Sequence, residues 1–177
     1  MPDFASLSAV IGAGLTPTLA FLYQRLEQLL DRGGAPEPDP AVPAELTGTL
    51  ALPLQADATR LAQHERDLAS LRDGLNVYYR GDAPVAATDD ALLRTLGRAR
   101  SLLEDIYSQR LTFAGEQRPA SGPFVRQDTE RVQGEQIGMD ADEIEGNASV
   151  EQKTHTVERG STNIGMRARR IGGLPPV

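Results

Sequence analysis

A short block of sequence near the C-terminus occurs twice, and it restricts the possible folds of this chain more than any other feature. Residues 137–146 read IGMDADEIEG, and residues 164–173, 27 positions later, read IGMRARRIGG. The Ile, Gly, Met and Ala positions are kept, whereas the acidic residues at 140, 142 and 143 become arginines. Constant apolar positions with inverted charges predict that the two copies stack on each other.

The spacing within each copy predicts extended structure with a bend. In an extended chain alternate side chains share a face, so Ile137, Met139 and Ala141 would line one side of a narrow dry core. Ile144 has the opposite parity, so we expect an arc near residues 142–143 that leads into a second short strand. Stacking the two copies at a spacing of about 4.8 Å would place each apolar residue over its counterpart in the other copy and each acidic residue over an arginine. Exposed ion pairs contribute only about 0–1 kcal/mol each, so their main effect would be on register.

The residues predicted to mediate self-assembly are the two copies and the amide residue before each. In the first copy they are Gln136, Ile137, Gly138, Met139, Asp140, Ala141, Asp142, Glu143, Ile144 and Gly146. In the second they are Asn163, Ile164, Gly165, Met166, Arg167, Ala168, Arg169, Arg170, Ile171 and Gly173. The expected neighbours are Asp140 with Arg167, Asp142 with Arg169, Glu143 with Arg170, and Gln136 over Asn163 as an amide ladder.

Two stacked rungs would leave two open sheet edges. Either the rest of the chain caps one edge or other chains add to them, and a folded β-solenoid tail without polymerisation is the alternative. Residues 150–157, between the copies, are β-permissive and form either a further strand or a loop. The closing glycines of both copies suit unusual backbone angles.

The N-terminal stretch 4–24 carries no charge and has the length of a bilayer span, about 20 residues. Three interpretations remain open: a buried first helix kinked at Pro17, a segment that inserts into a membrane conditionally, or a constitutive anchor. A secretory signal is not expected, because Asp3 and no basic residue precede the stretch. The predicted membrane-interacting residues are Phe4, Leu7, Val10, Ile11, Leu15, Leu19, Phe21 and Leu22.

The fold class predicted for the whole chain is α+β. Apolar spacing continues the first helix to a stop at Gly33, and it predicts helices over 56–79 and from an N-cap at 88–90 to about 108. We therefore expect a three-helix domain over 1–113, a linker over 114–124, and a tail over 125–177 that is either disordered or β-rich.

Composition argues against several classes of function. The net charge of −7 disfavours nucleic-acid binding, which needs a basic surface. The chain has two histidines and no cysteine, and it lacks a phosphate-binding glycine loop. We therefore expect no enzymatic activity and no cofactor or metal.

The paired Ile-Gly blocks with opposite charges resemble the amyloid signalling motifs of fungal HET-s type prion domains. They also resemble the bacterial amyloid signalling sequences associated with NOD-like receptors. Ile137-Gly138 and Ile164-Gly165, each after an amide residue, are similar to the core of the RIP homotypic interaction motif. In those families the motif follows a helical effector domain, called HeLo, HELL or Bell, whose apolar N-terminal helix acts on membranes. The helical part here is as short as expected of the bacterial type.

The resemblance implies a non-enzymatic effector of cell death or immunity with two parts. A NOD-like receptor bearing a similar motif would seed a cross-β stack, the tail would add to it, and the helical domain would release its first helix to membrane lipid. The implied partners are further copies of the chain, that receptor and lipid. The implied location is cytoplasmic, with conditional or peripheral membrane association. A soluble scaffold whose tail mediates oligomerisation without membrane action is the alternative.

Overall fold

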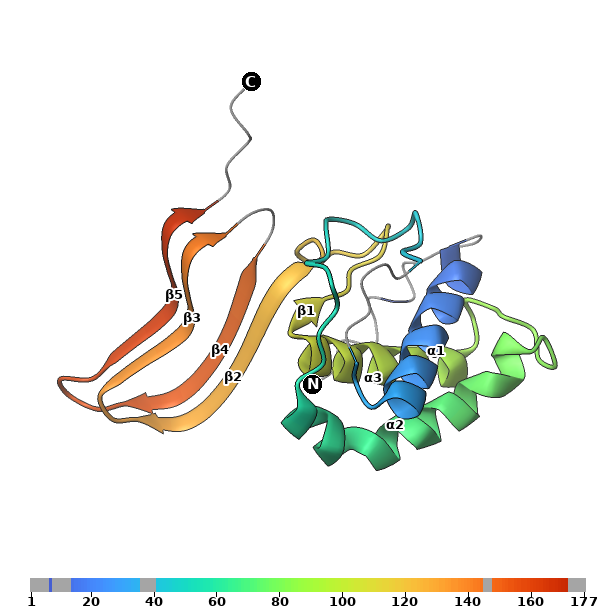
Figure 1. The fold of residues 1–177 in the computed structure, drawn as a ribbon, viewed down its shortest axis with the longest axis horizontal. Helices are drawn as coiled ribbons and strands as arrows, with labels where there is room; N and C mark the ends of the chain where they lie inside the picture. Colours follow the sequence, from blue (N-terminus) through green and yellow to red (C-terminus); the bar gives the residue numbers. More distant parts are fainter. Residues whose placement is uncertain (1–6, 8–13, 36–40, 145–147, 172–177) are drawn as a thin grey trace, which may run out of the picture.

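The computed structural model describes residues 7, 14–35, 41–144 and 148–171. Three helices precede a strand-rich C-terminal region, so the predicted α+β class and the three-helix reading are confirmed (Figure 1). The helices are α1 (Leu15–Arg32), α2 (Ala58–Tyr79) and α3 (Asp90–Tyr107). The strands are β1 (Gln109–Arg110), β2 (Gly122–Val132), β3 (Glu135–Ile144), β4 (Ser149–Val157) and β5 (Thr162–Ile171).

Helix α1 begins later than the uncharged stretch does. Its first helical residue is Leu15, so Pro17 lies in the first turn and not in the middle of the helix. The missing N–H of proline costs nothing there, because first-turn N–H groups have no partner within the helix. The predicted kink at Pro17 is therefore wrong for the described helix. The predicted stop is confirmed, since Gly33 ends α1 with φ +60°.

Aspartates cap the other two helices. The Asp57 carboxylate accepts a 2.9 Å hydrogen bond from Arg60 N at the start of α2. The Asp89 carboxylate accepts bonds of 3.0 Å from Ala91 N and Leu92 N, as the sequence predicted for α3. The Tyr78 hydroxyl donates to the same carboxylate at 2.9 Å. The bonds from Leu92 N and Tyr78 hold the pKa of Asp89 below its usual value.

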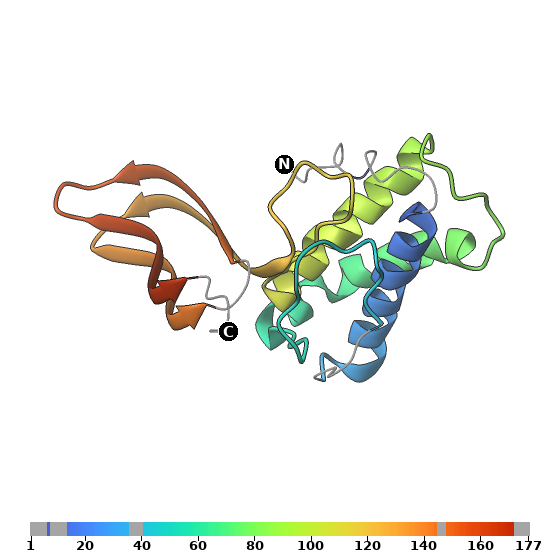
Figure 2. The same ribbon diagram turned by 90° about the horizontal axis from the view of Figure 1, so that it is seen from above.

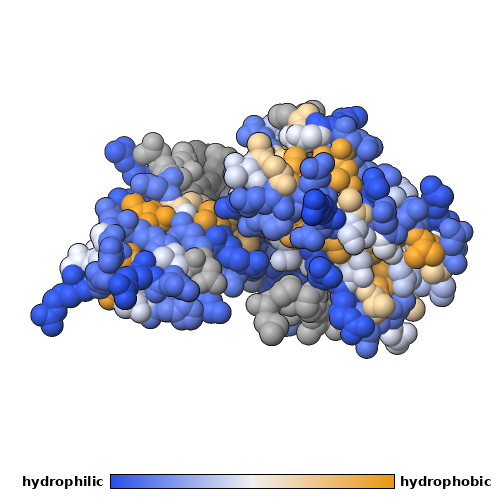
Figure 3. Space-filling model, turned by 90° about the horizontal axis from the view of Figure 1, so that it is seen from below, coloured by the Kyte–Doolittle hydropathy of each residue, from blue (hydrophilic) through white to orange (hydrophobic). Residues whose placement is uncertain are grey.

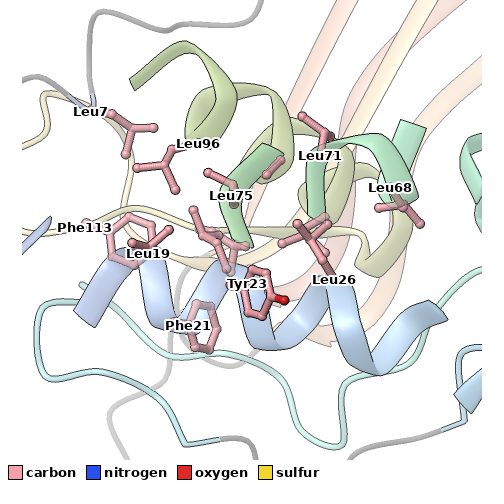
Figure 4. Close-up of a cluster of buried hydrophobic side chains, with 14 of the residues drawn as sticks. Leu7, Leu19, Phe21, Tyr23, Leu26, Leu68, Leu71, Leu75, Leu96 and Phe113 are labelled. Carbon is pink, nitrogen blue, oxygen red and sulfur yellow. The ribbon is translucent and has the colours of Figure 1, made fainter. Parts of the chain in front are cut away.

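The apolar faces of the three helices meet in one core (Figure 4). Leu26 and Leu22 of α1, Leu75 of α2 and Leu96 of α3 are all fully buried. Phe21 packs edge-to-face on Phe113, with ring centroids 6.4 Å apart. These contacts extend the core beyond the helices into the segment that follows β1.

Residues 41–57 and 111–121 connect the elements and pack against the helical core. The segment 46–54 forms no regular strand, and its isolated bridges include Leu46 with Phe113 and Gly48 with Ser121. A Cβ on Gly48 would lie 2.8 Å from Ser121 N, so the two segments cross too closely for a side chain.

The segment 114–124 is held to the helical domain by buried polar groups. Arg118 Nη2 lies 2.9 Å from Glu104 Oε1, and Arg100 pairs with Glu116. Ser121 Oγ accepts a 2.8 Å hydrogen bond from Thr112 N. Glu104 also accepts from Leu111 N at 2.9 Å, so one buried carboxylate joins α3 to both Leu111 and Arg118.

The strands form two sheets, in the orders β1-β2-β4 and β3-β5. The β2–β4 and β3–β5 pairs are parallel, whereas β1 is antiparallel to β2. The strand-rich region extends away from the helices, with β2 the nearest to them of the four long strands (Figures 1 and 2). Strand β1 therefore links the helical domain to the edge of the first sheet.

Candidate self-assembly site

The two copies of the repeated block lie side by side in β3 and β5. The paired positions include Gln136 with Asn163, Ile137 with Ile164, Met139 with Met166, Asp140 with Arg167, and Glu143 with Arg170. The predicted alignment of the copies, like over like and acid beside arginine, is confirmed within this chain. A parallel pair in this register brings each side chain next to its counterpart in the other copy.

The repeat is longer than the block that first reveals it. Strands β2 and β4 pair with an offset of 25 residues, and four identities recur there: Val125 with Val150, Gln127 with Gln152, Thr129 with Thr154, and Val132 with Val157. This second set was not predicted, although its pattern V-x-Q-x-T-x-x-V is visible in the sequence. The open question about residues 150–157 is answered, because they lie in strand β4.

Each copy is the second half of a strand–turn–strand unit. The first unit comprises β2 and β3 and the second comprises β4 and β5. The chain turns at residues 133–134 in the first unit and at 158–161 in the second, with Gly134 at φ +95°. Glu158 N donates to Val132 O at 3.2 Å and Thr162 N to Gly134 O at 2.7 Å, which ties the two turns together.

The predicted division of each copy into two strands is wrong. Strand β3 continues through Ile144 and β5 through Ile171, so neither copy contains a separate second strand. The chain reverses direction before each copy and not within it. The valine, glutamine and threonine positions that repeat upstream form the other strand of each unit.

The space between the two sheets is lined by amides and hydroxyls. Gln136 Nε2 donates to Gln127 Oε1 at 3.0 Å and to Thr129 Oγ1 at 2.9 Å. The second unit repeats the arrangement, with Asn163 Nδ2 donating to Thr154 Oγ1 at 2.9 Å. These bonds cross from one sheet to the other, so the side-chain amides of positions 136 and 163 are not joined in the ladder that the sequence predicted.

Side-chain amides are instead joined between the paired strands β2 and β4. Gln152 Nε2 donates to Gln127 Oε1 at 2.9 Å, which links the second unit to the first. The same nitrogen donates to Ile164 O at 3.1 Å, and Gln127 Nε2 donates to Ile137 O at 3.2 Å. Each glutamine therefore binds the backbone of the opposite sheet as well as its neighbour, which satisfies part-buried polar groups.

The predicted dry core is wrong for Ile137 and Met139, and the side chain of Ala141 lies outside the described residues. The Gln136 side chain faces β2, and a Cβ on Gly138 would meet Val150 and Gln152 of β4. Alternation along the strand then puts Ile137 and Met139 on the opposite face of the β3–β5 sheet. Both are partly exposed, and Figure 3 shows hydrophobic surface on the strand-rich region.

The two glycines of the Ile-Gly pairs have different surroundings. A Cβ on Gly138 would lie 2.5 Å from Val150 Cγ1 and 2.9 Å from Gln152 Nε2, and it would also meet the carbonyl oxygen of Gly165. A Cβ on Gly165 would find Gln152 Oε1 at 3.8 Å as its nearest described neighbour. Gly138 is thus covered by the second unit, whereas Gly165 has room for a methyl group.

Ion pairs cross between the units at exposed positions. Arg126 lies 3.5 Å from Glu151, its ladder partner, and Arg131 lies 3.5 Å from Glu158. Arg167 is opposite Asp140 in the ladder, as predicted, and its guanidinium contacts Glu135 at the start of β3. A long, exposed arginine side chain can pair with either of two neighbouring carboxylates with little difference in free energy. These ion pairs therefore influence register more than stability.

Arg110 connects the helical domain to both units. Its guanidinium lies 4.2 Å over the Phe124 ring, its Nε donates to Ser149 Oγ at 3.1 Å, and its Nη2 lies 3.8 Å from Glu151. Burial and the nearby Arg118 lower the pKa of Arg110. Because β1 pairs with Gly122 and Pro123, it covers the outer edge of the first unit only at the start of β2.

The second unit has an open outer edge. Strand β4 ends the order of the first sheet, and β5 is one of only two strands in the second. Within the described part of the chain, no strand pairs with the outer side of either one. Open parallel edges of this kind are templates for another chain.

The described residues of the predicted membrane segment are in the helical core. Leu7, Leu15, Leu19, Phe21 and Leu22 are each at most 2% exposed. Phe4, Val10 and Ile11 lie outside the described residues, as do Gly146 and Gly173 of the predicted assembly set. Ala141, Asp142 and Glu143 belong to β3, and Ala168, Arg169, Arg170 and Ile171 belong to β5. Among the helices described here, none combines the length and hydrophobicity needed to cross a bilayer.

Comparisons of the chain with protein-family models, curated proteins and solved structures gave no match. Over the described residues, no cluster of three or more metal-binding side chains occurs.

Proposed function

We propose that this protein is a non-enzymatic effector whose activity is switched by templated cross-β assembly of its C-terminal repeats. The observation that carries the proposal is the parallel, in-register pairing of two homologous units that leaves the outer edge of the second unit open. A further unit of the same kind would continue the same hydrogen-bond pattern, as a β-solenoid or an amyloid stack does.

The side chains support repetition as well as the backbone does. The Gln127–Gln152 bond is part of a ladder that another glutamine could extend, and amide ladders are characteristic of cross-β stacks. The partly exposed Ile and Met positions would form continuous apolar ribbons along such a stack. Alternating charges at positions 140 and 167 would favour alternation of the two kinds of unit.

The proposed output is action on a membrane, in a cell-death or immune response. Its support is the uncharged N-terminal stretch, part of which contributes α1 and Leu7 to the helical core. Release of this stretch would expose a large apolar surface with affinity for lipid. A receptor that carries a similar repeat, of the NOD-like type, would supply the first template.

A soluble scaffold is the second candidate function. It is favoured by the burial of Leu19 and Leu22 at the centre of the three-helix core. A helix this deeply packed can serve simply to fold the domain, with the strand units responsible for oligomerisation. The two candidates agree on assembly and differ on whether lipid is contacted.

One experiment tests both parts of the proposal with the full-length chain. Sonicated fibres of the protein are added to its monomer, growth is followed by light scattering, and fibres are examined by diffraction for reflections near about 4.8 and 10 Å. Dye-loaded anionic vesicles are present in a parallel series. Growth with dye release supports the membrane effector, and growth without release supports the scaffold. Absence of seeded growth or of the cross-β reflections overturns templated assembly.

A further inference from the structure

We propose that the outer edge of β4 and β5 receives the first unit of a second copy of this chain, and that Gly165 is the residue that makes room for it. This inference rests on the proposed templated assembly and specifies the docking edge, the occupant and the residue that controls entry. The growing stack would therefore have direction, with second unit always joined to first unit.

The contact inside one chain shows what a unit requires of the next one. The Cβ direction of Gly138 in the first unit leads to the Gly165 carbonyl, to Val150 and to Gln152 of the second unit. A methyl group there would lie 2.5–2.9 Å from side-chain atoms and against a backbone carbonyl that cannot move aside. Close pairing of two units thus depends on glycine in the unit that is covered.

Repeating the same step places a second copy against Gly165. Gly138 and Gly165 are equivalent positions, as are Val125 with Val150 and Gln127 with Gln152. The groups over Gly165 would therefore be the carbonyl of the second copy's Gly138 and the side chains of its Val125 and Gln127. The space now found next to Gly165, 3.8 Å to the nearest atom, is the space that those groups would fill.

Charge complementarity identifies the first unit, and not another second unit, as the occupant. Arg126 is the ladder neighbour of Glu151 and Asp140 is that of Arg167. A further first unit would put Glu151 between two arginines and Arg167 between two aspartates. In-register pairing of two second units would instead oppose Glu151 to Glu151 and Arg167 to Arg167, which is repulsive.

The helical domain leaves this docking possible. Strand β1 and Ser108 occupy the outer edge of β2 as far as Phe124, whose N–H donates to Ser108 O at 2.8 Å, whereas the inter-unit ladder runs on to Val132 and Val157. The incoming copy can therefore present its β2 from Val125 onward with β1 and the Ser108–Phe124 hydrogen bond still in place. The rest of the outer edge of β2 in the incoming copy can then pair with the outer edge of β4 in the copy already in the stack.

The test uses the full-length variant Gly165→Ala and two comparison variants. Gly74→Ala is the matched control, because a Cβ there also has its nearest neighbour at 3.8 Å but lies on α2. Gly138→Ala removes the covered glycine. We expect the Gly165→Ala monomer to keep the wild-type thermal midpoint and amide exchange, whereas Gly138→Ala loses exchange protection in β3 and β5.

Seeded growth then measures docking. We expect Gly165→Ala alone to elongate at least about tenfold more slowly than wild type or Gly74→Ala. The reason is that the added methyl group lies at every junction between the second unit of one molecule and the first unit of the next. Added to wild-type monomer at a low ratio, it should stop growth at one end, since its first unit still docks but its second unit accepts nothing.

Each other result overturns the inference. Elongation of Gly165→Ala at the wild-type rate would mean that no copy lies over this glycine. If the Gly165→Ala variant grows poorly but does not inhibit growth of wild type, the second units of two molecules pair with each other. A monomer as destabilised as Gly138→Ala would place Gly165 inside the resting fold. Failure of wild type itself to grow overturns the proposed function, and this inference with it.

Discussion

The side-chain amide of Gln152 donates a 2.9 Å hydrogen bond to Gln127, the residue at the equivalent position of the first strand–turn–strand unit. The same amide donates to Ile164 O at 3.1 Å. One side chain therefore joins the two units to each other and the two sheets to each other. Few single residues in the strand-rich region connect as many elements.

Replacing this glutamine by methionine should weaken the strand-rich region while leaving the helices intact. The variant Gln152→Met keeps the side-chain length but leaves Gln127 Oε1 and the Ile164 carbonyl without that donor, at a cost of about 1–3 kcal/mol. Amide exchange in β4 and β5 should speed up accordingly. Gln63→Met, at an exposed position of α2, is the control and should change nothing. Unchanged exchange in β4 and β5 would contradict the importance of the amide network.

The buried carboxylate of Glu104 should be among the most sensitive groups of the helical domain. It is 1% exposed and accepts from Arg118 and Leu111 N. The variant Glu104→Gln leaves the Arg118 guanidinium buried without its counter-charge, so we expect a loss of about 3–5 kcal/mol in the free energy of unfolding. Urea unfolding measures this loss, and Glu65→Gln, exposed on α2, should be neutral. Equal stability of both variants would show that the buried pair contributes little.

The N-cap of α3 should make stability depend on pH in the acid range. The pKa of Asp89 in the folded state lies below its ordinary value because of hydrogen bonds from Leu92 N and Tyr78. The capping contribution is therefore present at neutral pH and is lost as the pH falls through the lowered pKa. Thermal midpoints of wild type and Asp89→Asn should differ in slope below about pH 4, because the amide cannot titrate. Identical slopes would contradict this role of the carboxylate.

Reversing one charge in the ladder should impair assembly through repulsion. Arg167 lies opposite Asp140 in the chain, and in the proposed stack it would lie between two such aspartates. The variant Arg167→Asp therefore brings like charges together, at about 0.2–1 kcal/mol for each neighbour. We expect slower seeded growth at low salt and partial recovery at high salt.

The control for this experiment is Arg159→Asp, which changes the net charge equally but lies in the turn between β4 and β5. It should grow like wild type. Equal inhibition by both variants would attribute the effect to net charge and not to the ladder.

Much of the helical domain was predictable because its signals are local. Residues that cap or stop a helix act within one turn of their own position, as Asp89 and Gly33 do, and the apolar stripe of α3 recurs with the helical period. The start of α1 was not predictable in this way, because an uncharged stretch carries no marker of where the helix begins. Its first turn at Leu15 places Pro17 where a missing N–H is harmless.

The candidate site was predictable in part. The kept positions of the repeated block led to the pairing of Ile137 with Ile164 and Met139 with Met166. The preceding repeat, from Val125 and Val150 onward, was missed because its identities are spaced out among variable polar residues. Without that other leg, the reversal was assigned to the block itself, and an arc was expected where the strand in fact continues.

The sequence by itself determined which residues of the two copies lie side by side, because the repeated apolar and charged positions favour one register of two similar strands. The tertiary structure alone decided which face of those strands turns inward. Apolar residues at alternate positions suggested an Ile and Met core, but Gln136 and Gly138 face the β2–β4 sheet instead. The reason is that alternation along a strand defines two faces without deciding which one turns inward, and that choice depends on the partners that the amides find on β2 and β4.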